Sequence, residues 1–325
     1  MHISSSLFCR VSRSSLTCIS PALALMLFFL YFALPQAAMA TDPSEELSKA
    51  LASHIKYSAE QLQTIDSAEP LIASRDRCLA TIYHGTGSVP LWVTESGPNP
   101  RGTIVFDLLR DAGNEGLVPA DYQTEEIGKL WNSLDVSDLA QLDSLLTYNL
   151  LRYAHDVSYG QLGSYALNPN ILADTGRQDF DPLSTAQMIL AAPNLSEYLA
   201  SLPPAHQHYA SLREALKTYR KLAADGGWKS IPAGPVLHPG EIDPRVPAIR
   251  TRLQITGDLE KITDSGTVYD TALKKGVIHF QRRYGLEPDG VIGPQSIAAM
   301  NIPAKHLVNQ IIVNMTRWRW QAHDL

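Results

Sequence analysis

Apolar residues recur along most of this chain at steps of three and four, the spacing that places side chains on one face of a helix. The longest such stripe extends over about five turns and consists of Leu139, Leu142, Leu146, Leu150, Tyr153 and Val157. Asp135 and Ser137 precede it, and both residue types cap helix starts. The pattern therefore predicts a long helix whose apolar face belongs to a core.

Shorter amphipathic segments predict further helices before and after this one. Glycine and proline separate them. The segments 85–87 and 89–93 are expected to be irregular or extended, and loops are expected at 97–100 and 161–181. A tail helix with an apolar face through Leu307, Ile311, Met315 and Trp318 is also expected. The sequence thus predicts a mainly α fold, with helices near 44–62, 75–83, 105–112, 185–191, 195–202 and 209–219.

A second helical group lies between residues 244 and 301. Its central helix has Leu273, Val277, Phe280 and Tyr284 on one face. Gly285 follows the last periodic residue, where a helix can end in a left-handed conformation that glycine adopts at little cost. A turn at Asp289-Gly290 and a new helix start at Gly293-Pro294 complete a three-helix unit. Gly276 interrupts the central helix, so alanine there is expected to be stabilising.

Several pieces of this unit form a recognisable combination. Leu253-Gln254, Val277-x-x-Phe280-Gln281 and Gly285-Leu286-x-x-Asp289-Gly290-x-x-Gly293 occur in this order. The combination resembles the small peptidoglycan-binding module found in bacterial cell-wall enzymes, which implies peptidoglycan as a partner. Most of these residues have a structural interpretation, because apolar residues build a core and glycines build turns.

The helical geometry selects candidate binding residues on this module. At 100° per residue, Arg282 lies nearly opposite the apolar face, while Gln281 and Arg283 flank it. Arginine can pair a carboxylate in two places, and glutamine offers a donor and an acceptor to an amide. Gln281, Arg283 and Asp289 are therefore the predicted peptidoglycan-binding residues. The alternative, that all three are solvated or serve the fold, stays open.

A longer resemblance covers nearly all of the chain after residue 81. Its pieces are Pro90-Leu91-Trp92, Leu108-Leu109-Arg110-x-Ala112, Glu115-Gly116-Leu117-x-Pro119-x-Asp121-Tyr122, Tyr209-x-x-Leu212-Arg213, Gly226-Gly227-Trp228 and Asn314-Met315-x-Arg317-Trp318-Arg319-Trp320. These resemble the large periplasmic L,D-transpeptidases. The implied domains are a signal peptide (1–40), a helical scaffold (41–240), the binding module (241–302) and a helical tail leading towards a catalytic domain (303–325).

The N-terminus predicts export. Arg10 and Arg13 precede an apolar run at 22–34, and Ala38-Met39-Ala40 resembles a cleavage site. An uncleaved membrane anchor is the alternative; after cleavage we expect a periplasmic protein with no stable membrane span. The net charge is −6, and cleavage would remove two arginines and no acid. Nucleic acid is therefore not an expected partner.

Catalytic chemistry is not expected from this chain alone. The resembled enzymes use a cysteine and a histidine in a segment close to Ser-His-Gly-Cys, and no such segment follows Trp320. Cys78 is the only cysteine after residue 40 and is expected to be a buried, inert thiol. His206-x-His208 is expected at the surface, with no metal and no cofactor. Two alternatives stay open: a fragment of a longer active transpeptidase, and a protein-binding adaptor for cell-wall synthesis proteins.

Overall fold

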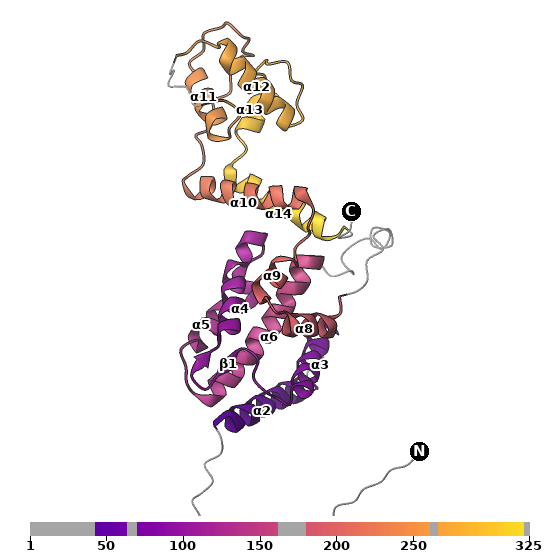
Figure 1. The fold of residues 1–325 in the computed structure, drawn as a ribbon. Helices are drawn as coiled ribbons and strands as arrows, with labels where there is room; N and C mark the ends of the chain where they lie inside the picture. Colours follow the sequence, from indigo (N-terminus) through magenta and orange to yellow (C-terminus); the bar gives the residue numbers. More distant parts are fainter. Residues whose placement is uncertain (1–42, 64–69, 162–179, 261–265, 322–325) are drawn as a thin grey trace, which may run out of the picture. The chain divides into compact units, whose positions relative to one another are not determined.

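The computed structural model describes residues 43–63, 70–161, 180–260 and 266–321, so the predicted signal peptide lies outside the described residues. The fold is mainly α, as predicted (Figure 1). Its helices are α2 (Pro43–Gln63), α3 (Pro70–Gly85), α4 (Pro100–Arg110), η1 (Asp111–Glu115), η2 (Pro119–Tyr122), α5 (Thr124–Leu130), α6 (Val136–Tyr159), α8 (Pro182–Ala191), α9 (Leu195–Ala200), α10 (Gln207–Ala224), α11 (Val246–Ile255), α12 (Thr271–Arg283), α13 (Pro294–Met300) and α14 (Ala304–Arg319). Within these described ranges, no helix is long and apolar enough to cross a membrane.

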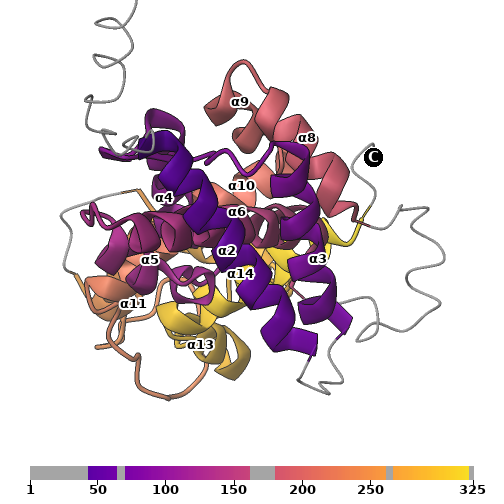
Figure 2. The same cartoon turned by 90° about the horizontal axis from the view of Figure 1, so that it is seen from below.

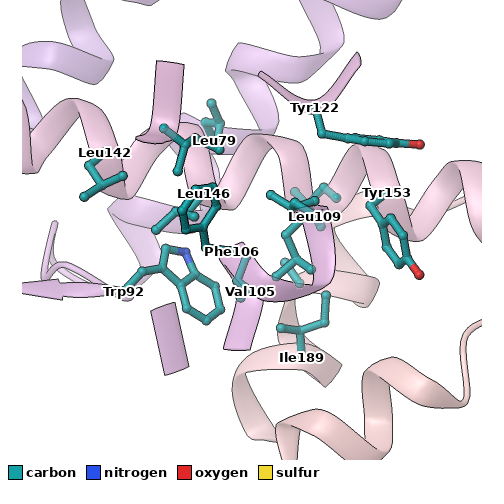
Figure 3. Packing of buried hydrophobic residues seen from close by; sticks show 14 of the residues in the cluster. Leu79, Trp92, Val105, Phe106, Leu109, Tyr122, Leu142, Leu146, Tyr153 and Ile189 are labelled. Atoms are coloured by element: carbon teal, nitrogen blue, oxygen red, sulfur yellow. The ribbon is translucent and has the colours of Figure 1, made fainter. Parts of the chain in front are cut away.

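Helix α6 carries the first core. Asp135 caps it, because its Oδ1 accepts hydrogen bonds from the N–H groups of Ser137 (2.9 Å) and Asp138 (3.1 Å). The predicted stripe is buried along its full length and packs against α3, α4, α5 and α8. Figure 3 shows Leu146 of α6 in the same cluster as Val105 and Leu109 of α4. The prediction of a long core helix is confirmed.

A small antiparallel hairpin, β1 (Val93–Thr94) with β2 (Gly97–Pro98), follows the extended segment and is held by α6. The buried carboxylate of Asp143 accepts backbone N–H groups from Leu91 (2.9 Å), Trp92 (2.7 Å) and Val93 (3.1 Å). The Tyr83 hydroxyl donates to its Oδ1 at 2.6 Å. Burial raises the pKa of Asp143, although these hydrogen bonds act in the opposite direction. The Asp143 carboxylate thus supplies the hydrogen-bond acceptors that the N–H groups of residues 91–93 lack within their own segment.

Helices α10 and α14 form an antiparallel pair (Figures 1 and 2). At one end Arg319 contacts Tyr209, and at the other Gly227 lies beside Ala304. Met315 is fully buried in the seam with Leu216 and Tyr209. The predicted tail helix therefore exists, and α10 covers its apolar face.

The three helices α11, α12 and α13 enclose a separate core. The segment 228–243 packs against it, since Ile231 and Leu237 are buried there. Leu237 pairs with Ile292 in an isolated antiparallel bridge. The Asn301 side chain accepts from the backbone N–H of Ile231 (2.8 Å) and donates to its carbonyl (2.9 Å). This segment is thus a packed part of the module.

Candidate functional site

Both ends of helix α12 are capped locally, and its end at Gly285 is the one that the sequence predicts. Asp270 caps the start, accepting the N–H of Leu273 at 2.8 Å. Gly285 has a φ of 66°, and the N–H of Leu286 bonds the carbonyl of Gln281 at 2.8 Å. This closure is the usual role of a left-handed glycine after a helix. It directs the chain into the loop that carries Asp289.

Gln281 lies inside the module, with 2% of its surface exposed. Its Nε2 donates to Asp289 Oδ1 and to the carbonyl of Val291, both at 3.0 Å. Its Oε1 accepts the N–H of Gly290 at 2.9 Å. Both ends of the amide are therefore used within the fold, where they fasten the loop after α12 to the helix.

Asp289 lies at the surface of that loop. Its Oδ1 also accepts the N–H of Val291 at 2.8 Å. The bond from Val291, followed by that from Gln281, lowers the pKa of Asp289, so the carboxylate is charged at neutral pH. Gly290 adopts a φ of 73°, and its carbonyl accepts the Tyr269 hydroxyl at 2.6 Å. The predicted Asp-Gly turn is thus present and anchored from two sides.

Arg283 belongs to a different cluster of contacts. It pairs with the fully buried side chain of Asp258 through Nε (3.0 Å) and Nη2, while about a third of the Arg283 side chain (35%) stays exposed. Nη1 donates to the Tyr219 hydroxyl at 3.2 Å. Burial opposes the charge on Arg283, but hydrogen bonding and charge from Asp258 outweigh it and raise its pKa. The guanidinium is a permanent, partly accessible cation.

The structure therefore brings Gln281 and Asp289 into direct contact and gives Arg283 a separate partner. Arg282, predicted to lie opposite the core, is exposed. The surface offers a charged carboxylate at Asp289 and guanidinium groups at Arg282 and Arg283. These groups can bind amides, ammonium groups and carboxylates, and they provide no nucleophile and general-base pair.

The sequence pattern did not predict that Asp258 and His279 lie beside Arg283. His279 Nδ1 lies 2.8 Å from Asp258 Oδ1, although 21 residues separate them. Asp258 follows Gly257, whose φ of 76° ends α11. That turn was a visible signal, but the partners of the aspartate depend on how α11 and α12 pack.

Arg252 was also missed. Its guanidinium is buried and lies over the Trp228 ring, 3.6 Å from the ring centroid. Its Nε donates to the carbonyl of Met300 at 2.8 Å. Arg252 thus joins Trp228, in the segment 228–243, to helices α11 and α13.

Residues with catalytic or metal-binding chemistry lie elsewhere. Cys78 is buried, as predicted, and burial together with Asp181 raises its pKa to about 11. The thiol is therefore protonated at neutral pH and a poor nucleophile. His206 stacks on Trp318 with ring centroids 4.4 Å apart, and His208 lies 5.7 Å from the same ring. The part of the chain that the structure describes holds no group of three or more His, Cys, Asp or Glu residues arranged for a metal ion.

Comparison with known families identifies two domains within the chain. Residues 77–216 match the scaffold domain family, which spans α6 and its surrounding helices. Residues 243–300 match a peptidoglycan binding domain family and cover α11 to α13. No curated protein matches the chain significantly. The protein therefore contains a scaffold domain followed by a peptidoglycan-binding domain.

Proposed function

We propose that this protein binds peptidoglycan in the bacterial cell envelope through residues 243–300. The observation that carries the proposal is the match of these residues to a peptidoglycan-binding family, together with their own buried core. A domain with its own core can present a fixed ligand surface. Peptidoglycan stems carry amides, carboxylates and amines, which suit the polar side chains on this module.

The residues proposed for this contact are Gln281, Arg283 and Asp289, in unequal roles. Asp289 and Arg283 offer exposed charge of opposite sign to the stem peptide. Gln281 acts from beneath the surface, because its amide holds Asp289 and the backbone of the loop. A change at Gln281 should consequently act through the shape of the loop.

Sedimentation with purified sacculi tests this assignment. Asp289→Asn keeps the acceptor for Val291 and removes the charge, whereas Glu287→Gln removes an exposed charge two residues away. We expect Asp289→Asn to reduce retention by about threefold to tenfold and Glu287→Gln to leave it unchanged. Arg283→Lys against Arg282→Lys provides a second matched pair. Equal retention by all four variants, with folding unchanged, removes these residues from the site.

The wider setting that we propose is an exported protein related to the large periplasmic L,D-transpeptidases. The order of scaffold and peptidoglycan-binding domains supports it, as does the Arg10, Arg13 and Ala38-x-Ala40 pattern. Mass spectrometry of the native protein should find Thr41 at the N-terminus, and an intact Met1 argues against export by cleavage.

The burial of the Cys78 thiol and its raised pKa argue against a catalytic role for this residue. Incubation of the chain with tetrapeptide muropeptides should yield no cross-linked product and no acylated Cys78. An in-frame continuation beyond Leu325 that encodes a Ser-His-Gly-Cys segment would instead favour the alternative of a longer active transpeptidase.

A further inference from the structure

A small cavity of about 240 Å³ opens on the scaffold domain, between the β1–β2 hairpin, α4 and the turn after α5. It belongs to neither the binding module nor the contacts of Cys78. Its lining consists of Ser96, Gly97, Pro98, Thr103, Trp131, Asn132, Ser133 and Leu134. None of these lining side chains is charged.

The walls of this cavity are held in place by the fold. Thr94 Oγ1 donates to the carbonyl of Gly97 at 3.1 Å and fixes the tip of the hairpin. The Trp131 ring packs against Phe106, with ring centroids 4.4 Å apart. The Ser133 hydroxyl donates at 2.6 Å to a carboxylate in the first turn of α6. A ligand would therefore meet a largely preformed surface, which limits the entropy cost of binding.

The lining combines an aromatic surface with neutral hydrogen-bonding groups. Trp131 is half-buried, and the neighbouring Leu134 is 66% exposed. Within the described part of the chain, the Ser96 hydroxyl and the Asn132 amide have no hydrogen-bond partner, and both residues are exposed. The Thr103 hydroxyl donates to the Asn99 carbonyl and keeps its lone pairs for a ligand donor.

This chemistry selects one class of ligand. Without a charged lining residue, the cavity offers little to phosphate, carboxylate or ammonium groups. A sugar ring has an apolar face of C–H groups and an edge of hydroxyls, which match an indole and neutral polar side chains. The volume lies below the range of about 300–1,000 Å³ typical of sites for drug-sized ligands. One pyranose ring is the unit that suits it.

We propose that this cavity binds a neutral saccharide ring. The natural source is the glycan strand of peptidoglycan, an identification that rests on the proposed function. Trp131 stacks on the ring, while Ser96, Thr103 and Asn132 bind its hydroxyl or N-acetyl groups. The scaffold domain then contacts the glycan independently of the module at 243–300.

In the test, the purified full chain is titrated with tetra-N-acetylchitotetraose, a glycan without peptide. Binding is measured by calorimetry and by saturation-transfer NMR. The double variant Ser96→Ala/Asn132→Ala should bind about tenfold more weakly through the loss of two hydrogen bonds. Asn114→Ala changes an exposed asparagine outside the cavity and should bind normally. Trp131→Phe should keep the packing against Phe106 and weaken the stacking.

Lack of binding by the unchanged chain at millimolar sugar would overturn the proposal, as would equal affinity of the double variant and Asn114→Ala. Binding of a sugar-free tetrapeptide stem that is lost in the double variant, with sugar binding unchanged, would also overturn it. Sacculus retention of Asp289→Asn and of the double variant separates the two sites. Loss with Asp289→Asn alone supports the module and contradicts a glycan role for the cavity, whereas loss with the double variant alone does the reverse.

Discussion

The guanidinium of Arg319, near the end of α14, donates a hydrogen bond to the hydroxyl of Tyr209 in the first turn of α10 (2.8 Å), across 110 residues of sequence. The same hydroxyl donates to the carboxylate of Glu115 at 2.7 Å, and Arg319 Nη2 also bonds the Glu115 carbonyl. Both Arg319 and Glu115 are buried. A polar network thus ties η1, α10 and the tail helix together.

Arg319→Met should lower the free energy of unfolding by about 3 kcal/mol, because it removes a buried cation and leaves the Glu115 carbonyl without this donor. Arg317→Met changes an exposed arginine two residues earlier and should stay within about 0.5 kcal/mol. Urea unfolding curves measure both effects. Similar midpoints for the two variants would contradict a stabilising role of the network.

Met315 fills the seam between α14 and α10 and is fully buried. Met315→Ala should cost about 2–5 kcal/mol through lost burial and a residual cavity. Val313→Ala, at a position 50% exposed, is the control and should have little effect.

A chain ended at Pro303 should likewise lose stability and soluble yield, because the apolar face of α10 would lose its cover. An improved yield would show that α14 is dispensable.

The close packing around Gly276 reverses the expectation, based on helix propensity, that alanine at this position is stabilising. A Cβ there would lie 3.1 Å from the backbone carbonyl oxygen of Asp258, and the Asp258 N–H is itself bonded to Leu253 at 2.8 Å. Because that backbone has little freedom to move, Gly276→Ala should destabilise the module by about 1 kcal/mol. A Cβ at Gly128 in α5 would have only one neighbouring atom within 4 Å, the Phe106 Cζ at 3.9 Å. Gly128→Ala should therefore raise the free energy of unfolding by about 0.5–1 kcal/mol. Differential scanning calorimetry distinguishes the signs, and a raised midpoint for Gly276→Ala would restore the original expectation.

Acid should weaken the binding module. Hydrogen bonds from arginines lower the pKa values of Asp243 and Asp270; at Asp258 burial raises the pKa, but hydrogen bonds led by Arg283 outweigh it. Because the folded pKa lies below the unfolded value of about 3.9, the stabilisation is present above that pH. It is lost as the pH falls through the folded pKa. We therefore expect similar melting temperatures at pH 7 and pH 5 and a lower one at pH 3.

The variant for this test is Asp270→Asn, which keeps a cap for α12 and removes the ion pair with Arg250. Its melting temperature should fall less between pH 5 and pH 3 than that of the unchanged chain. Glu287→Gln, which alters an exposed carboxylate, serves as the control. Equal acid sensitivity of Asp270→Asn and the unchanged chain would show that this pair does not contribute.

The sequence by itself determined the elements whose causes are local. The stripe on α6, its cap at Asp135 and the end of α12 at Gly285 were all predictable. Each depends on contacts between residues a few positions apart, where the periodicity of a helix and the freedom of glycine decide the outcome. The binding module itself was recognisable for the same reason, because its turns and core positions lie within one short segment.

Only the tertiary structure decided what the polar side chains do. Gln281 looked like a surface residue flanking an apolar face, yet the loop after α12 folds back over it and uses its amide. Arg283 pairs with Asp258, and Arg319 bonds Tyr209. The partners in each pair are too far apart in the sequence for a local pattern to predict the contact. Such partners are set by which helices pack together, and a buried charge or amide is stable only where that packing supplies its hydrogen bonds.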